Sequence, residues 1–412
     1  MQFRIAFLLF VLSTGSVIGQ TEKVPNIAAV VTTYYHNSHA DVIVSRLLQT
    51  DTLDGKGKRP KLNLVSLHTD QVPDNDKSRE LSKKHGFPIY KTVADALTLG
   101  TGELAVDGVL LIAEHGKYPE SETGQFMFPK RRLFGEIIKV FEKSDRVVPV
   151  FCDKHLADTW KDAKWIYDQA QRLRIPMMAG SSLPILWRYP PVDLKRDAKI
   201  KQLVAVSYHR IDAYGFHALE MVQSLVERRT GGETGVQSVY TIEGDEVWKA
   251  ADRGVYDRRL LDETLLRLRA KKVPKGKTIE EVAREPVLLV IDYKDGLRVC
   301  VFCLQYAVLE WACAWRYEDG RTASTLFWTQ EERPFQHFAH LLSGIERMMH
   351  TGKPTWPVER TLLTSGTLDA LLTSKFKGGQ RLATPYLAIS YENEFNWKQP
   401  SPPPPGRDIR GP

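Results

Sequence analysis

The chain has 412 residues, enough for two domains, and its 42% hydrophobic and 26% charged residues are typical of a soluble globular protein. The net charge of +7 comes from lysines and arginines spread along the whole length. No basic stripe is interleaved with aromatic residues, so the charge argues against a nucleic-acid partner.

Residues 1–19 have the layout of a secretory signal peptide. Arg4 precedes the apolar run Ile5–Leu12, and small residues lead up to Gly19. The run is too short to span a bilayer, and there is no twin-arginine pair. We therefore expect export by a Sec-type route to the periplasm or the extracellular space, with no stable membrane insertion after cleavage. A retained, uncleaved anchor is the alternative.

Residues 24–185 alternate apolar, strand-like runs with amphipathic helical patterns. Nearly continuous apolar runs indicate strands that are covered on both faces, as in parallel sheets. Right-handed crossovers then predict a doubly wound, Rossmann-like α/β domain. The strand-like runs are Ile27–Thr32, Leu62–Leu67, Val106–Ala113 and Val147–Phe151.

The pattern changes at residue 186, where a proline-rich joint begins. Two β-rich runs on either side of Asp295–Gly296, and two more around Asp319–Gly320, predict hairpins. Residues 186–398 are therefore expected to form an α+β domain with an open antiparallel sheet, covered by helices near residues 335–349 and 358–374. We expect any homo-oligomer to form through this sheet. The proline-rich residues 399–412 are predicted to be a disordered tail.

The four cysteines give a weak signal. Cys300 and Cys303 are spaced as CxxC, but they lie in a strand-like run, where residues three apart face opposite sides of a sheet. Together with Cys152 and Cys313, they are predicted to be buried free thiols.

Polar residues follow the predicted strands of the first domain. In an open α/β sheet, ligands bind outside the carboxyl ends of the strands, so these residues are expected to line one crevice. Each histidine, taken alone, could instead be structural. The candidates are His36, His39, His68, Glu114, His115, Asp153, Lys154 and His155. A divalent metal is conceivable at His36, His39 and His115, but ligands from separate loops make a weak metal motif.

One block, VFCDKHLADTWKDAKWIYDQAQRLRIPMMAGSS, resembles a segment of the Gfo/Idh/MocA family of oxidoreductases, which act mostly on sugars and cyclitols. In that family an E-K-P tripeptide precedes a helix and a strand that ends near M-x-G. The likeness spans about Asn26 to Tyr391 and implies a Rossmann domain followed by an α/β domain. It also implies that Lys154 is the lysine that contacts cofactor and substrate.

A second stretch, AYGFHALE, is similar to the family's D-x-G-x-H motif at the start of a helix. The resemblance places His217 on the histidine that often acts as catalytic acid/base. The aspartate position holds Ala213, with Asp212 one residue earlier. Asp212 and Tyr214 are therefore substrate-contact candidates.

The turn after the first strand departs from the family. Aligning the histidine of G-x-G-x-x-G-x-x-H with His39 puts Val31, Thr33 and His36 at the three glycines. Those glycines allow the tight turn, the approach of the diphosphate and close helix packing. Thr33 and His36 would then line the crevice, and NAD(P) bound in the ordinary manner is doubtful.

These observations favour an exported protein that acts on a sugar or sugar derivative by non-redox acid/base chemistry, with Lys154 and His217 as the catalytic pair and a divalent metal as an optional aid. One alternative is an NAD(P)-dependent sugar oxidoreductase with an altered cofactor pose. Another is a non-catalytic sugar-binding protein, for which Trp187, Trp248, Trp311 and Trp315 suit sugar stacking, although most are expected in the core.

Overall fold

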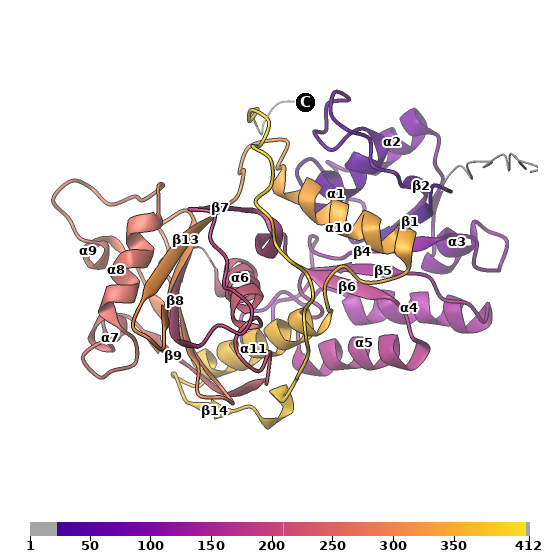
Figure 1. Ribbon diagram of the computed structural model, residues 1–412. Helices are drawn as coiled ribbons and strands as arrows, with labels where there is room; N and C mark the ends of the chain where they lie inside the picture. Colours follow the sequence, from indigo (N-terminus) through magenta and orange to yellow (C-terminus); the bar gives the residue numbers. More distant parts are fainter. Residues whose placement is uncertain (1–22, 209, 409–412) are drawn as a thin grey trace, which may run out of the picture.

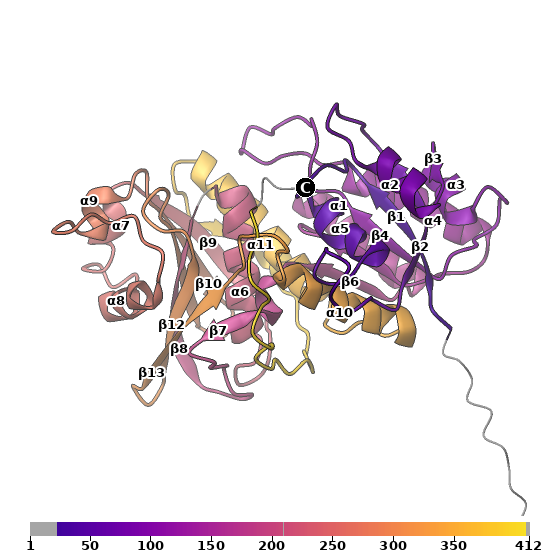
Figure 2. The same ribbon diagram turned by 90° about the horizontal axis from the view of Figure 1, so that it is seen from above.

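The computed structural model describes residues 23–208 and 210–408, and it shows two domains side by side (Figures 1 and 2). The predicted signal peptide, residues 1–19, lies outside the described residues. Among the helices that are described, none is both long and apolar enough to cross a membrane.

The first domain contains the predicted parallel sheet, with six strands in the order β3-β2-β1-β4-β5-β6. This order reverses direction between β1 and β4, as in a doubly wound fold. The strands are β1 (Asn26–Val31), β2 (Asn63–Thr69), β3 (Ile89–Tyr90), β4 (Gly108–Ile112), β5 (Val150–Asp153) and β6 (Met177–Gly180).

Helices cover both faces of this sheet because successive strand residues point to opposite sides. One face packs on α3 (Val93–Thr98), α4 (Lys130–Lys143) and α5 (Trp160–Leu173). The other face packs on α1 (His39–Leu48) and the short α2 (Ser78–His85). Side chains of Ser38, Thr92 and Thr159 cap α1, α3 and α5, which explains where these three helices begin.

Helix α10 (His337–Thr351) lies beside α1 on the first sheet (Figure 1). The expectation that both late helices cover the second sheet was therefore wrong for α10. The apolar stripe of this helix, which includes Phe338, Leu341 and Ile345, packs with the strands of the first domain. An amphipathic pattern indicates an apolar face but does not say which sheet will bury it.

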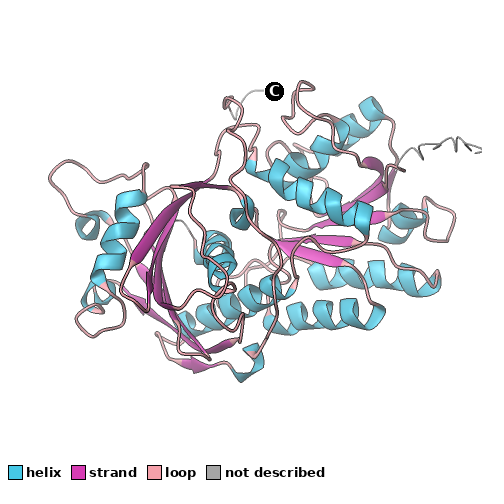
Figure 3. Ribbon diagram, in the orientation of Figure 1, coloured by secondary structure: helices cyan, strands magenta, loops and turns pink. Residues whose placement is uncertain are grey.

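The second domain is built on an eight-stranded sheet in the order β14-β9-β10-β11-β8-β12-β13-β7. Figure 3 shows the strands in magenta and the helices around them in cyan. Most pairs are antiparallel, but β8 and β11 pair in parallel, so the sheet is mixed. The predicted hairpins join β10 to β11 and β12 to β13. The strands are β7 (Trp187–Tyr189), β8 (Ile200–Ser207), β9 (Val236–Glu243), β10 (Val287–Tyr293), β11 (Arg298–Cys303), β12 (Trp311–Tyr317), β13 (Thr322–Trp328) and β14 (Leu382–Ala383).

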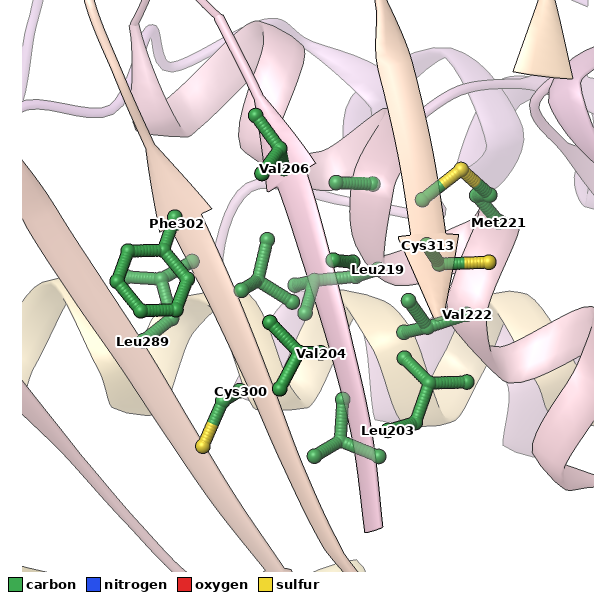
Figure 4. Close-up of a cluster of buried hydrophobic side chains, with 14 of the residues drawn as sticks. Leu203, Val204, Val206, Leu219, Met221, Val222, Leu289, Cys300, Phe302 and Cys313 are labelled. Atoms are coloured by element: carbon green, nitrogen blue, oxygen red, sulfur yellow. The ribbon is translucent and has the colours of Figure 1, made fainter. Parts of the chain in front are cut away.

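Helices α6 (Phe216–Val226) and α11 (Glu359–Phe376) pack on the side of this sheet that faces the first domain, as Figure 1 shows. Figure 4 shows Leu219 and Val222 of α6 against Val204 of β8 in an apolar core. All four cysteines are buried and free, as predicted.

The outer side of the second sheet is also covered. The segment between β9 and β10 folds into α7 (Glu246–Lys249), α8 (Arg258–Arg267) and α9 (Ile279–Val282). Helix α8 lies on β8, β12 and β13, with Leu260 and Leu261 fully buried. The protein's own helix occupies the part of this surface over β8, β12 and β13, and an oligomer formed through the sheet stays a prediction.

The end of the chain was expected to be disordered, but residues 399–408 dock on the folded protein. Trp187 Nε1 donates to the Ser401 carbonyl at 2.8 Å, and Gln330 Nε2 donates to the Pro404 carbonyl at 2.7 Å. Arg407 N donates to the Arg333 carbonyl at 2.7 Å. A proline-rich strand cannot build a core, yet its free carbonyls accept hydrogen bonds from buried donors.

Candidate active site

A buried ion pair joins the ends of β4 and β5. Glu114 follows β4, Lys154 follows β5, and Lys154 Nζ donates to Glu114 Oε1. The two side chains are only 9% and 3% exposed. Burial alone would lower the pKa of Lys154, but Glu114 raises it above its ordinary value, so the ammonium is held charged. Glu114 Oε2 is buried and has no hydrogen-bond partner among the described residues.

The carboxylate of Asp153 holds His39 beside this pair. His39 Nδ1 lies 2.6 Å from Asp153 Oδ2. Burial opposes ionisation of Asp153, but His39 lowers the pKa of this carboxyl below its ordinary value. Lys130, at the start of α4, supports the loop by donating from Nζ to the carbonyls of Asp153 and His155 at 3.1 and 2.7 Å. The contact between His39 and Asp153 thus attaches the first turn of α1 to the end of β5.

His115 fills the space between α1 and the ion pair. Its Nδ1 accepts from the backbone N of His39 at 3.5 Å, and the two rings meet edge to face at 5.1 Å. The Tyr35 ring lies 5.6 Å away on the other side. Burial and then His39 lower the pKa of His115 to about 4, so this ring is neutral near pH 7.

His155 and Asp212 connect the first domain to the second. His155 Nε2 donates to the Asp212 carbonyl at 2.7 Å, and the backbone N of Phe126 donates to the Asp212 carboxylate at 3.3 Å. Burial raises the pKa of Asp212 to about 6. Burial, followed by Lys154, lowers the pKa of His155 well below its ordinary value. The carboxyl of Asp212 therefore takes up a proton more readily than an exposed aspartate does.

His217 lies in the first turn of α6, at the second-domain side of the crevice. Its Nδ1 is 2.6 Å from Ser181 Oγ, just after β6. The ring meets Trp311 and Tyr214 edge-on at 5.7 and 6.4 Å. Burial and then Lys154 lower the pKa of His217 well below its ordinary value. A neutral imidazole is suited to accept a proton.

Not every candidate joins this cluster. His68 Nδ1 bonds instead to the Tyr90 carbonyl at 3.2 Å, within the sheet. His36 lies 3.8 Å from the Asp41 carboxylate, at the far side of α1's first turn. Thr33 Oγ1 is buried and has no hydrogen-bond partner among the described residues.

The metal prediction is not supported by the geometry. Within residues 23–208 and 210–408, no three His, Cys, Asp or Glu side chains are grouped so that they could hold an ion. His39 is bonded to Asp153 and His115 to the His39 backbone, while His36 faces Asp41. The contacts described for the three candidate histidines do not converge on one point.

The tryptophans proposed for stacking are also mostly structural. Trp187, Trp311 and Trp315 are buried, and only Trp248 is partly exposed, where it stacks on Phe302. None of the three buried rings presents a free face, as expected for core residues.

The first turn of α1 is closed by the protein's own groups. Asp41 accepts from the backbone N of Asn37 at 2.9 Å, and Arg333 Nη1 donates to both Asp41 and Asn37 at 2.8 Å. Positive φ in this turn occurs at Asn37 and not at the three positions aligned with the family's glycines. The turn thus forms without glycine, and a carboxylate lies at the helix end where anions usually bind.

Sequence reasoning missed Lys130, Ser181 and Arg333. Ser181 stands inside the quoted MMAGSS block, so its position after β6 was a usable signal. Arg333 lies almost 300 residues from Asp41, and no local pattern indicates such a contact.

No family model matches the sequence, and neither does any curated protein. Solved structures do match its fold. GenD2 from gentamicin A biosynthesis, in complex with NAD, is 11% identical with a TM-score of 0.57, covering 89% of this chain and 98% of its own. Scyllo-inositol dehydrogenase from Lactobacillus casei is 10% identical with a TM-score of 0.55, covering 88% and 99%.

Myo-inositol dehydrogenase from Lactobacillus casei, in complex with NAD(H) and myo-inositol, is 11% identical with a TM-score of 0.54, covering 88% of this chain and 97% of its own. The chain therefore has the fold of the Gfo/Idh/MocA-type oxidoreductases. The resemblance expected from the block that contains Asp153, Lys154 and His155 is confirmed at the level of the fold.

Proposed function

We propose that the protein is an enzyme that binds a sugar or cyclitol at Lys154 and Glu114 and moves a proton from one of its hydroxyl groups. The observation that carries this proposal is the second oxygen of Glu114, which is buried beside a charged lysine and lacks a partner among the described residues. A buried acceptor is costly when it is left unpaired, so it marks a place for a donor such as a hydroxyl group.

The surrounding groups supply the rest of the chemistry. One substrate hydroxyl can donate to Glu114 Oε2. The oxygen of a neighbouring hydroxyl can accept from Lys154 Nζ while that hydroxyl donates its hydrogen to His217. The ammonium stabilises negative charge that develops on that oxygen, and neutral His217 can take the proton. Lys154 is thus the electrostatic residue, and His217 is the acid/base.

The first candidate for the overall reaction is oxidation of the sugar. The structures compared above are named as dehydrogenases or contain NAD, and these names favour an oxidoreductase over non-redox chemistry. When bound, a nicotinamide dinucleotide would supply the hydride acceptor for such an oxidation.

The residues after β1 do not fit the ordinary diphosphate seat of such a cofactor. Val31, Thr33 and His36 stand at the three glycine positions, and the Asp41 carboxylate lies at the helix end that would face the diphosphate. Like charges repel there, although Arg333 offsets part of the charge. An oxidoreductase would need an altered cofactor pose, and no step is derived through the cofactor.

This same turn favours a second candidate, non-redox acid/base chemistry on a sugar. Proton transfer from a hydroxyl group to His217, with Lys154 stabilising the charge that develops, needs no hydride acceptor. Export also stays a proposal, and it is supported by the signal-like residues 1–19. An exported chain that crosses the membrane unfolded would lose a cofactor bound beforehand.

The test is a binding titration on the purified full chain. NAD(H) and NADP(H) are titrated by calorimetry, and a panel of sugars and cyclitols is screened by thermal shift, then assayed for turnover. Dinucleotide binding with sugar oxidation supports the first candidate, and turnover without a dinucleotide supports the second.

Variants decide whether the proposed centre is correct. Lys154→Ala and His217→Ala should each abolish turnover, while the surface variants Lys164→Ala and His85→Ala should leave it unchanged, because those side chains lie on the outer helices α5 and α2. Full activity in both site variants would show that the reaction occurs elsewhere.

A further inference from the structure

A hollow lies near the proposed centre, on the side of the second domain. Its volume is about 620 Å³, within the range of ~300–1,000 Å³ that small-molecule pockets occupy. One wall is the loop of residues 122–124, which belongs to the first domain. The opposite wall consists of the end of β9, the start of β10 and the last turn of α11. The hollow therefore lies between the two domains.

Asp212 belongs both to this hollow and to the proposed centre. Its side chain lines the hollow, while its carbonyl accepts from His155, the neighbour of Lys154. Only 5% of Asp212 is exposed, and Lys154 is among the charges that act on its carboxyl, so Asp212 lies close to both the hollow and the Lys154–Glu114 pair. A ligand that occupies both spaces would pass this residue.

The side chains around the hollow suit a sugar unit. Gln305, Glu285 and Glu122 line it, and these three side chains make no hydrogen bond or ion pair with any described residue. Amide and carboxylate oxygens of this kind bind hydroxyl groups. The Phe376 ring, at the end of α11, is 59% exposed at the same hollow and offers an apolar face for the C–H side of a sugar ring.

The loop wall is held in place before any ligand arrives. Arg210 of the second domain pairs with Glu120 at 2.7 Å, and its guanidinium lies 4.9 Å above the Phe126 ring. Gln125 Nε2 donates to the Asp158 carbonyl, which fixes the other side of the loop. A preformed wall lowers the entropy that binding costs.

We propose that the hollow binds a second sugar unit, so that the substrate is an oligosaccharide whose reacting unit lies at Lys154 and whose next unit lies against Phe376 and Gln305. This inference rests on the proposed function, because the reacting unit is placed by the Lys154–Glu114 pair. It adds a substrate class, linked sugars, that the centre alone does not specify.

The test compares single sugars with linked ones. The full chain is applied to an array of immobilised mono-, di- and oligosaccharides of varied composition, and the affinities of the best pair are then measured in solution by calorimetry. The variants are Phe376→Ala and Gln305→Ala. The control is Leu266→Ala, which removes another exposed apolar side chain, 79% exposed, on the outer helix α8.

We expect the wild-type chain to bind a di- or oligosaccharide more tightly than its single unit. Phe376→Ala should weaken the oligosaccharide at least about fivefold and leave the single sugar unchanged, while the control changes neither. Equal affinity for single and linked sugars, or an oligosaccharide affinity that Phe376→Ala leaves intact, would overturn the second-unit site alone. Absence of binding to every sugar would overturn the proposed function as well.

Discussion

The carboxylates that follow β1 and β4 lie at the same edge of the first sheet, yet their oxygens are satisfied differently. After β1, Asp41 has three hydrogen-bond donors, namely Asn37, Ser45 and Arg333. After β4, Glu114 has one donor, Lys154, and its other oxygen is left without one among the described residues. A completed network stabilises the fold, whereas an incomplete buried one indicates a place for a ligand.

The largest expected effect is at the incomplete site. Lys154→Met leaves the Glu114 carboxylate buried without its cation, and we expect the free energy of unfolding to fall by ~3–5 kcal/mol. The measurement is urea unfolding of the full chain at pH 7. Adding Glu114→Gln to this variant removes the buried charge and should restore more than half of the loss. A loss below about 1 kcal/mol in the single variant would contradict the buried pair.

His115 lies between the two turns and should make stability depend on pH. Its pKa is about 4 in the folded protein, against an ordinary value near 6.5, so the unfolded chain takes up the proton first. Stability is therefore lost as the pH falls from about 6.5 toward 4, by roughly 2–3 kcal/mol. Unfolding of wild type and His115→Gln between pH 7 and pH 4.5 checks this, and the variant should lose this part of the dependence. Identical pH profiles would show that the His115 ring is not held neutral in the folded protein.

Removing a donor from Asp41, in the turn after β1, should lower the free energy of unfolding less than Lys154→Met does. Arg333→Met removes one of three donors to Asp41, and we expect a loss of ~2 kcal/mol at pH 7. Burial opposes ionisation of Asp41, but Arg333 brings its pKa below the ordinary value, so this stability is present above the unfolded pKa and is lost as the pH falls through the folded one. The gap between wild type and variant should shrink below about pH 4. A constant gap down to pH 2 would mean that Arg333 acts only by packing.

Ser181→Ala is expected to have the smallest effect on stability. It should, however, change the tautomer of His217. Accepting a proton at Nε2 requires that Nδ1 carry the hydrogen and donate it to Ser181 Oγ, 2.6 Å away. Nitrogen-15 NMR of histidine-labelled protein should show the Nδ1–H tautomer in wild type and a mixture in Ser181→Ala. The matched control, Ser182→Ala, should not alter it. A wild-type signal from the Nε2–H form would assign His217 as a proton donor instead.

Much of the fold could be predicted from local sequence. Continuous apolar runs gave the parallel strands, the Asp-Gly pairs gave both hairpins, and the block that contains Asp153, Lys154 and His155 indicated the family. Partners distant in sequence could not be predicted. The periodicity of residues 335–349 predicts an apolar face but not the sheet on which this face packs. The covering of the second sheet by α8 depends on how residues 244–286 fold back onto that sheet.

The sequence could predict which residues lie at the candidate site, but not which of their side chains contact each other. Sheet topology gathers Glu114, Asp153 and Lys154 at one edge, as expected from the strand ends. Which histidine is directed to which carboxylate depends on side-chain packing. His36 lies against Asp41, and His68 bonds to the Tyr90 carbonyl, which the strand order alone does not indicate. The hollow at Phe376 could not be inferred, because its walls come from six segments that lie far apart in the sequence.

The position of α10 has a consequence for biosynthesis. The face of the first sheet that α10 covers, around Ile27, Leu110 and Phe151, is formed by the first 180 residues, but its cover is encoded after residue 336. A ribosome must therefore complete most of the chain before this domain can finish folding. Fragments that stop at the joint between the domains would expose an apolar surface and should aggregate.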